Sequence, residues 1–234
     1  MPALLAIDVG GSHVKALSNA AAGEPRRIKS GPGLSAAAMV AAVRALTADW
    51  RYEAVSIGFP GPAPHGRPLA EPPHLGGGWV GFDFAAAFGC PVQLINDAAM
   101  QALGSYDGGR MLFLGLGTGL GSALIVDGQL VPMELAHLPY RKRTFEHYVG
   151  ERARQRKGKK QWRRAVAEVI EHLRAALEPD YVVVGGGNAR WLDRLPDGVR
   201  RGDNRNAFAG GFRLWDPDHP APAPPESAPI DKAC

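Results

Sequence analysis

Apolar residues along the chain follow two patterns, and each pattern predicts one kind of element. Short continuous runs rich in β-branched residues at 4–9, 54–59 and 91–96 are typical of buried strands. Between them, apolar residues recur at helical spacing in 35–50, where Ser35 is in position to cap the helix. Because strands alternate with helices along the chain, the sequence predicts an α/β fold.

The rest of the chain continues this alternation. Further strands are predicted at 13–18, 111–116, 122–128 and 180–187, and further helices at 82–89, 97–104, 144–177 and 188–195. Gly89 is expected to end its helix, and the long helical segment is expected to be broken near Gly158. The stretches LLAIDVGGSHVKAL and LFLGLGTGLGSALI each contain a strand, a glycine turn and a strand, so two related half-domains that face each other are expected.

Length and composition are those of an ordinary globular protein. The 234 residues are enough for one large domain or two small ones, and 45% of them are hydrophobic and 21% charged. No run approaches the roughly 20 apolar residues of a membrane span, and the N-terminus has no basic leader, so we expect a cytoplasmic protein without a membrane anchor. The two cysteines, Cys90 and Cys234, form neither a disulfide framework nor a thiolate metal site. The Pro/Ala-rich segment 216–234 is expected to be a flexible tail.

Positive charge is concentrated in one segment. The formal net charge is +4 and the pI about 9.2, and the excess lies in 141–164, RKRTFEHYVGERARQRKGKKQWRR. Three hypotheses are open for this basic segment: a solvated pair of helices, a nucleic-acid surface, or a surface for an anionic small substrate or polymer. Its aromatic residues have helical spacing, which is more typical of core packing than of base stacking.

Three glycine-rich turns follow predicted strands. In the first, Gly10, Gly11 and Ser12 can bring backbone N–H groups and a hydroxyl close to an anion. Asp8, at the tip of the strand, can hold a hydrated Mg²⁺, which prefers a carboxylate plus waters. A tight β-turn capped by Asp8 is the structural alternative. Lys15, on the next strand, either lies near bound phosphates or is an exposed strand residue.

The second turn contains Gly117, Thr118 and Gly119 between two apolar strands, and several of its amides can point at one anion. It is neither a Walker loop nor a dinucleotide fingerprint, because no helix pattern follows it and it lacks a Gly-Lys-Ser/Thr sequence. The third turn consists of Gly185, Gly186 and Gly187. It could let a flat base or a phosphate lie against the backbone. A glycine-rich hairpin and close packing of a strand against a helix are the structural alternatives for these two turns.

Asn96 and Asp97 stand at the junction of a predicted strand and a predicted helix. A carboxylate there can accept a proton from a hydroxyl that attacks phosphorus, and the adjacent amide can hydrogen-bond a neighbouring hydroxyl. Either residue could instead cap the helix. Glu134 and His137 are three residues apart, so both could contact one polyol. They could also be a surface pair, and the absence of further ligands nearby argues against a metal site.

In this order, the motifs resemble the sugar-kinase/actin/heat-shock ATPase superfamily. Within it they are most similar to the ROK family of bacterial sugar kinases and regulators, and to its polyphosphate-glucokinase-like branch. The stretches that carry the resemblance are AIDVGGSHVKAL, SIGFPGP, GWVGFDF, LINDA, GLGTGLGSALIVDG, MELAH, the basic helices after RKR, and PDYVVVGGGNA. They extend over nearly the whole chain, and their order is more specific than any one of them.

The resemblance implies an α/β fold of the two-domain actin-like ATPase (ribonuclease H-like) type. A cleft would separate an N-terminal domain, 1–97, from a C-terminal domain, 98–215. The resemblance also implies that Asp97 is the general base on the sugar hydroxyl. Four residues would line the sugar: Asn96, Glu134, His137 and Gly61.

The implied activity is that of a phosphotransferase with an alcohol acceptor. A phosphoryl group would pass from ATP or polyphosphate to a hexose, foremost to the 6-hydroxyl of glucose, with Mg²⁺ bridging the donor phosphates. The glycine turns would face the donor from opposite sides, and Asp8 would hold the Mg²⁺ through water. A long polyphosphate would give the basic segment a function. Family members commonly pair as homodimers.

Several positions depart from the family pattern. No cysteine follows His137 before Cys234, so we expect no zinc, and Ala136 stands where the family motif has glycine. Ser12 replaces the usual threonine of the first turn, and EPPHLGGGW, with His74, stands where an asparagine often precedes a tryptophan. The chain starts at the first phosphate strand, without the helix-turn-helix of ROK regulators. These changes leave the hexose open, so a sugar or nucleotide sensor without turnover is the alternative, and nucleic-acid binding is not expected.

Overall fold

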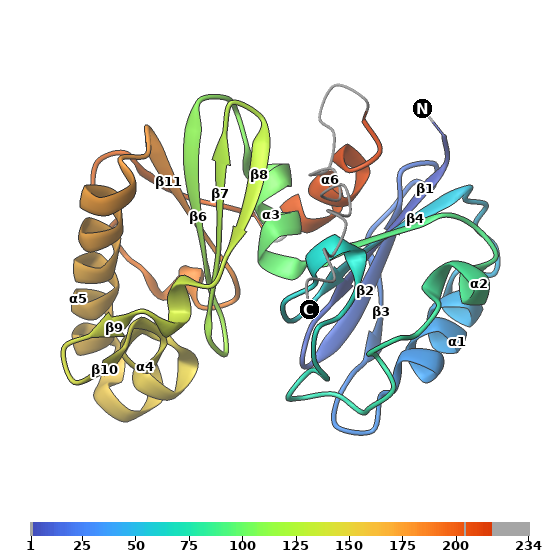
Figure 1. Ribbon diagram of the computed structural model, residues 1–234, viewed down its shortest axis with the longest axis horizontal. Helices are drawn as coiled ribbons and strands as arrows, with labels where there is room; N and C mark the ends of the chain where they lie inside the picture. Colours follow the sequence, from blue (N-terminus) through green and yellow to red (C-terminus); the bar gives the residue numbers. More distant parts are fainter. Residues whose placement is uncertain (1, 204, 217–234) are drawn as a thin grey trace, which may run out of the picture.

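The computed structural model describes residues 2–203 and 205–216 and contains two five-stranded sheets, with helices between them and on their outer sides (Figure 1). This mixed architecture confirms the predicted α/β fold. The predicted flexible tail, 216–234, lies outside the described residues except for Asp216. Within the described part of the chain, no helix has both the length and the apolar character that crossing a bilayer requires.

The first sheet is formed by the N-terminal part of the chain. Its strands are β1 (Leu4–Val9), β2 (His13–Ser18), β3 (Arg26–Lys29), β4 (Ala54–Phe59) and β5 (Val92–Asn96), in the order β3-β2-β1-β4-β5. β1, β2 and β3 are antiparallel neighbours, whereas β4 and β5 extend the sheet parallel to β1. Helices α1 (Ala36–Leu46) and α2 (Phe84–Phe88) pack with β1 and β4 around one apolar core, and a 3₁₀ turn lies at Pro64–Gly66.

The second sheet repeats this arrangement. Its strands are β6 (Arg110–Leu116), β7 (Leu120–Val126), β8 (Gln129–Met133), β11 (Tyr181–Gly185) and β12 (Val199–Arg201), in the order β12-β11-β6-β7-β8. Here too, three antiparallel strands are followed by two parallel ones. The predicted repetition of two half-domains is therefore confirmed. The outer core is covered by α4 (Phe145–Val149) and α5 (Glu151–Leu177), with 3₁₀ turns at Leu135–His137 and Ala189–Trp191 and a short pair, β9 (Pro139–Tyr140) and β10 (Arg143–Thr144).

Local signals in the sequence place several helix ends correctly. The Ser35 hydroxyl accepts a hydrogen bond from the Ala38 amide at 3.2 Å and caps α1. Gly89 ends α2 in the left-handed conformation with φ 75°. Gly158 breaks the long helix with φ 75° and ψ 163°, as its position in the sequence predicts.

Helices α3 (Asp97–Ser105) and α6 (Asn206–Arg213) lie side by side between the two sheets (Figure 1). Glycines allow their backbones to touch. A Cβ on Gly104 would overlap the carbonyl oxygen of Asn206, and a Cβ on Gly210 would overlap that of Met100. Because α6 also packs on β1 and β4 of the first sheet, it joins both halves. We therefore retain the division into 1–97 and 98–215 only as a proposal.

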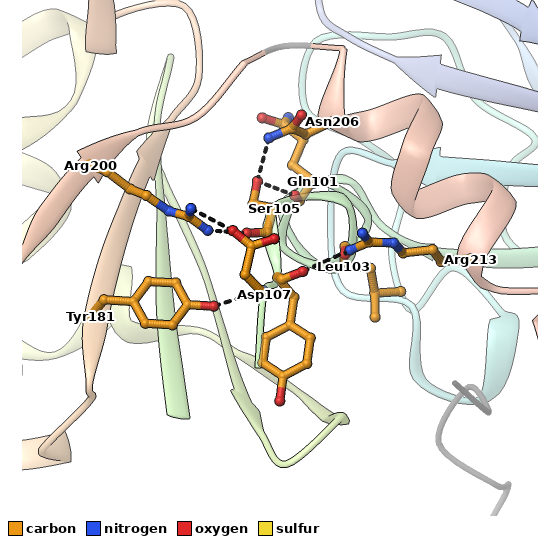
Figure 2. Close-up of polar contacts among 9 residues, drawn as sticks. Gln101, Leu103, Ser105, Asp107, Tyr181, Arg200, Asn206 and Arg213 are labelled. Carbon is orange, nitrogen blue, oxygen red and sulfur yellow. Dashed lines mark hydrogen bonds and ion pairs between the residues drawn. The ribbon is translucent and has the colours of Figure 1, made fainter. Parts of the chain in front are cut away.

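Two arginines close the C-terminal end of α3 (Figure 2). Arg200 donates to the carbonyl of Ser105 at 2.6 Å, and Arg213 donates to the carbonyls of Leu103 and Tyr106. The last carbonyls of a helix lack intrahelical partners and carry partial negative charge, so guanidinium groups there stabilise the helix. Arg200 comes from the second sheet and Arg213 from α6, and together they fix α3 in the middle of the molecule.

The prediction of a helix at 188–195 is wrong. The structure has only a 3₁₀ turn at Ala189–Trp191, and Leu192 is extended. The Asn188 side chain makes no capping hydrogen bond there, and its amide donates to the carbonyl of Gly117 at 2.9 Å. The sequence pattern also missed β3, β8, β12 and α6. β3 and β12 are short and largely exposed, so they lack the apolar signal of a buried strand.

Candidate active site

The candidate site lies at the carboxyl ends of the parallel strands. In the first sheet, Asp8 of β1 is in register with Gly58 of β4, and Gly58 is in register with Ile95 of β5. Asn96 and Asp97 follow directly, so they stand at the same edge as Asp8. In α/β sheets ligands bind in the crevice outside this edge. Gly58 has no side chain, and a Cβ there would lie 3.4 Å from the Cα of Asp97.

Asp97 is the first residue of α3, and its pKa is raised to about 7. Burial is the largest cause, followed by the negative charge of Asp8; Glu134 raises the pKa further. A hydrogen bond of 2.7 Å from the Ala98 amide to Oδ1 works in the opposite direction. A carboxylate whose pKa lies near neutrality is suited to accept a proton from a hydroxyl.

Asp8 is a second carboxylate in the same place. Burial raises its pKa, and Lys15 lowers it. Lys15 is its cross-strand partner, with Nζ 3.7 Å from Oδ2. The structure thus brings Lys15 to Asp8, and its predicted contact with donor phosphates stays a prediction.

Asn96 caps α3 with its side chain. Its Oδ1 accepts hydrogen bonds from the amides of Ala98 at 2.9 Å and Ala99 at 3.1 Å. Its Nδ2 donates to the carbonyl of Gly61 at 3.2 Å. The two predicted sugar-side residues Asn96 and Gly61 are therefore in direct contact, and one amide hydrogen of Asn96 remains for a ligand.

The first glycine turn presents backbone donors. The Gly10 amide donates to the carbonyl of His13 at 3.0 Å, and Ser30 Oγ donates to the carbonyl of Gly10 at 2.6 Å. Among the described residues, the amides of Gly11 and Ser12 have no intramolecular acceptor, so they are available to an anion. A Cβ on Gly11 would lie 3.7 Å from the Cβ of His74, which places His74 beside this turn.

The second glycine turn is tied to the start of α5. The Glu151 amide donates to the carbonyls of Gly117 and Thr118 at 3.1 and 3.2 Å, and the Gly117 amide donates to the carbonyl of Gly119 at 3.1 Å. Within the described part of the chain, the amides of Thr118 and Gly119 have no intramolecular acceptor. The turn therefore has two free donors, as predicted for an anion site.

Glu146 is a site residue that the sequence pattern did not indicate. Its carboxylate lies so close to Gly119 that a Cβ there would overlap Oε2. Its charge also raises the pKa of Glu134, whose pKa is raised mainly by burial and lowered by His137. Glu146 lies within the basic segment, where a single acid gives no local signal; only the fold brings it to the second turn.

Glu134 directly precedes a 3₁₀ turn, Leu135–His137, and His137 is the last residue of that turn. Both side chains are exposed. Ser122 holds this turn in place: Oγ donates to the carbonyl of Met133 at 2.8 Å and accepts from the amide of Leu135 at 3.1 Å. Glu134 raises the pKa of Asp97, and His137 lowers the pKa of Glu134, so Glu134 lies near both residues. The contacts of Glu134 and His137 with a sugar stay predictions.

In the third glycine turn, two glycines are explained by packing. A Cβ on Gly185 would lie 2.6 Å from the ring of Phe113, and a Cβ on Gly186, with φ 79°, would collide with the backbone of Leu116. Gly187 has open space around it and is exposed. Gly185 and Gly186 are therefore needed for packing against a neighbouring strand, and the contact of the three glycines with a donor stays a prediction.

The site fits a hydrated divalent cation that is completed by a ligand. Asp8 is a hard oxygen donor, and its one ion-pair partner among the described residues, Lys15, lies 3.7 Å away. In the described residues there is no cluster of three or more His, Cys, Asp or Glu side chains that could hold a metal ion. A Mg²⁺ held through Asp8 would therefore take its other ligands from water and donor phosphates.

Comparison with known proteins agrees with this geometry. A sequence model of the ROK family matches residues 4–132. A polyphosphate glucokinase from Mycobacterium tuberculosis is 26% identical over 160 residues, which are 62% of this chain and 60% of that enzyme. An N-acetylmannosamine kinase from Salmonella paratyphi A is 31% identical over 141 residues, 54% of this chain and 48% of that enzyme. The matched regions cover 27% to 60% of the length of such curated relatives.

A solved structure extends the likeness to nearly the whole chain. The inorganic polyphosphate/ATP-glucomannokinase from Arthrobacter sp. strain KM superposes with a TM-score of 0.75 at 27% identity, covering 90% of this chain and 97% of that one. The likeness confirms the predicted two-domain actin-like fold over most of both chains.

Proposed function

Because the chain belongs to the ROK family, we propose that it transfers a phosphoryl group from polyphosphate or ATP to a hydroxyl of a hexose, with the 6-hydroxyl of glucose as the preferred acceptor. The observation that carries this proposal is Asp97. It is a carboxylate with a pKa raised to about 7 at the carboxyl edge of the first sheet. The similarity to a polyphosphate glucokinase and to a polyphosphate/ATP-glucomannokinase supports this choice of donor and acceptor.

In the proposed reaction, the hexose hydroxyl lies against Asp97. The hydroxyl oxygen forms a bond to the terminal phosphorus of the donor, and the bond from that phosphorus to its bridging oxygen breaks. The proton of the hydroxyl passes to the Asp97 carboxylate, and the shortened donor leaves with the bridging electron pair. A general base typically contributes about 10²- to 10⁴-fold to the rate.

The other residues position the substrates. The free amides of the first and second glycine turns would hold donor phosphates, and Mg²⁺ at Asp8 would offset their negative charge when bound. Glu134 and His137 would contact the sugar hydroxyls from the second half of the molecule. Glu146 would join them, because its carboxylate lies between Glu134 and the second turn. Asn96 and Gly61 would form the opposite wall of the sugar site.

The decisive experiment follows sugar phosphate with purified protein, Mg²⁺, either donor, and either glucose or N-acetylmannosamine. We expect glucose 6-phosphate from the wild type and a loss of kcat of at least about 100-fold in Asp97→Asn. Asp197→Asn makes the same chemical change at an exposed side chain with no hydrogen bond or ion pair among the described residues; it is the matched control and is expected to retain wild-type turnover.

Three other outcomes discriminate between hypotheses. Product from N-acetylmannosamine alone would support the proposed kinase activity but show that N-acetylmannosamine, and not glucose, is the acceptor. Full turnover by Asp97→Asn would refute Asp97 as the base. Sugar binding in calorimetry with no product from either donor would favour the alternative, a sugar sensor without turnover.

A further inference from the structure

Three cations gather over the indole ring of Trp191, and a fourth binds the backbone of the same residue. Lys159 Nζ lies 3.8 Å from the centroid of the Trp191 ring, and the guanidinium carbons of Arg190 and Arg154 lie at 4.9 and 5.3 Å. Arg163 donates from Nε to the backbone carbonyl of Trp191 at 2.5 Å. We call these four side chains and Trp191 the Trp191 cluster. The three cations over the ring are attracted to its face, but all four cations repel one another.

The cluster carries more positive charge than its neighbours neutralise. Glu151 pairs with Arg154, and Asp193 pairs with Arg163. Among the described residues, Lys159 and Arg190 have no ion-pair partner, and both are exposed. Two positive charges are therefore left over on one side of α5, where they create a positive potential that favours an anion.

The cluster adjoins the second glycine turn. Asn188 donates to the carbonyl of Gly117 at 2.9 Å, and Trp191 ends the 3₁₀ turn that starts directly after Asn188. On the other side, the amide of Glu151 at the start of α5 donates to the same carbonyl at 3.1 Å. Arg154 is one turn further along this helix. A chain of phosphates held at the second turn can therefore continue onto the cluster without leaving the protein surface.

We propose that the Trp191 cluster binds the distal phosphates of an extended inorganic polyphosphate whose reacting end lies in the cleft. This inference rests on the proposed function and names the part of the donor that lies beyond the reacting phosphates. Closely spaced phosphates match several Lys and Arg side chains, each of which makes a charge-assisted contact.

The same geometry disfavours a nucleic acid or a nucleotide base as the occupant. Proteins that bind single strands stack bases on free aromatic faces. Here three cations surround the Trp191 ring, and the indole Nε1 is buried without a hydrogen-bond partner in the described structure. The cluster offers charge and no free stacking face, which suits a polymer made only of phosphate.

The test compares two double variants that remove the same charge. Lys159→Gln/Arg190→Gln removes the two unpaired cations of the cluster. Arg174→Gln/Arg194→Gln removes one cation from the same helix, about 22 Å beyond Lys159 at 1.5 Å per residue, and one exposed cation from the loop after the cluster. Binding of fluorescently labelled long-chain polyphosphate is measured by anisotropy at two salt concentrations. The ratio of KM for long-chain polyphosphate to KM for tripolyphosphate is measured with glucose.

We expect the cluster variant to bind long polyphosphate about tenfold more weakly and to have a shallower salt dependence, because fewer counterions are released on binding. Its KM ratio should rise by about the same factor, whereas the control should stay within about twofold of the wild type for both measurements. Equal losses in both variants, or none in either, would overturn the proposal.

Two further outcomes are distinguishable. If the wild type phosphorylates no sugar with any donor, the proposed function fails, while anisotropy still tests polyphosphate binding on its own. If a single-stranded oligonucleotide of equal charge binds as tightly as polyphosphate and loses as much affinity in the cluster variant, the surface is a general nucleic-acid surface and the proposal is wrong.

Discussion

Asn96 and Asp97 are adjacent in the sequence, but their side chains have different surroundings. The Asn96 amide caps α3 and contacts Gly61, whereas the Asp97 carboxylate lies among Asp8 and Glu134. The sequence alone left capping and chemistry open for both residues. The structure gives the cap to Asn96, while Asp97 accepts the Ala98 amide through Oδ1 and its Oδ2 has no hydrogen-bond partner among the described residues. A role of Asn96 in holding sugar hydroxyls, through its remaining amide hydrogen, stays a prediction.

The raised pKa of Asp97 predicts how the proposed reaction depends on pH. A general base must be ionised, so kcat/KM should fall about tenfold per pH unit below the pKa of about 7 and level off above it. The measurement is a pH profile of kcat/KM for the sugar between pH 5 and 9, with the donor saturating.

His137→Asn is the control for this profile, because His137 lies beside Glu134 in the same site. If Asp97 causes the fall in kcat/KM at low pH, His137→Asn changes the rate but leaves the fall at the same pH. A profile without this fall in His137→Asn would contradict the prediction.

The same shift predicts that Asp97 lowers stability at neutral pH. Its folded pKa, about 7, lies above the unfolded value of about 3.9, so folding favours the protonated form. The stabilising contribution is therefore complete below pH 4 and is lost as the pH rises through 7. Asp97→Asn should raise Tm by a few degrees at pH 8 and by much less at pH 4.5, as measured by circular dichroism.

Asp197→Asn again serves as the matched control in these melts. It makes the same chemical change at an exposed position, so its Tm difference from the wild type should not depend on pH. A lower Tm for Asp97→Asn at pH 8 would show that the carboxylate makes favourable contacts that outweigh its burial.

Other site residues could not be predicted from local sequence. Glu146 lies 12 positions beyond Glu134 in a segment dominated by Lys and Arg, so its charge reads as part of a surface helix. Its role becomes visible only when α4 places it against Gly119. The third turn shows the opposite case, because Gly185 and Gly186 look like ligand contacts in the sequence but are needed for packing.

At the scale of elements, the pattern of apolar residues predicted the strands whose side chains are buried. The strands β1, β4, β6 and β11 are nearly continuous apolar runs and were all predicted, as was the break at Gly158. It failed for the edge strands β3 and β12, which are mostly exposed, and for α6, a short helix with two adjacent glycines. Those glycines lower helix propensity, but they allow α6 to touch α3.

The contact between α3 and α6 gives a prediction of its own. Gly104→Ala would place a methyl group on the carbonyl of Asn206, so the helices must separate. We expect a loss of about 1–3 kcal/mol in the free energy of unfolding, although alanine in a helix is normally favoured over glycine by about 1 kcal/mol. Urea denaturation measures this change.

Gly33→Ala is the matched control for that variant. An added Cβ at Gly33 has no neighbour within 4 Å, and its φ does not require glycine, so the substitution should be neutral or slightly stabilising. Equal stabilities for the two variants would mean that α3 and α6 can separate without cost.

At the scale of the whole molecule, the echo between two short stretches of sequence corresponds to a complete structural repeat. Both sheets have three antiparallel strands followed by two parallel ones. The repeat was predictable because each half begins with a strand, a glycine turn and a strand. The way in which the halves are joined was not predictable, because α6 follows the second sheet in the sequence but packs on the first sheet.

The contacts of α3 and α6 with both sheets predict that the two halves unfold together. α3 packs against strands of both sheets, and α6 binds α3 while it covers β1 and β4, so neither half keeps its inner face buried without the other (Figure 1). Hydrogen exchange followed by mass spectrometry should give the same unfolding free energy for peptides from β4 and β11, and calorimetry should give one transition. In Gly104→Ala, the added methyl group pushes α3 and α6 apart, so the two helices couple the sheets less. The unfolding free energies of the β4 and β11 peptides should then differ from each other. Two transitions in the wild type would instead show that the halves are independent domains, with α6 belonging to only one of them.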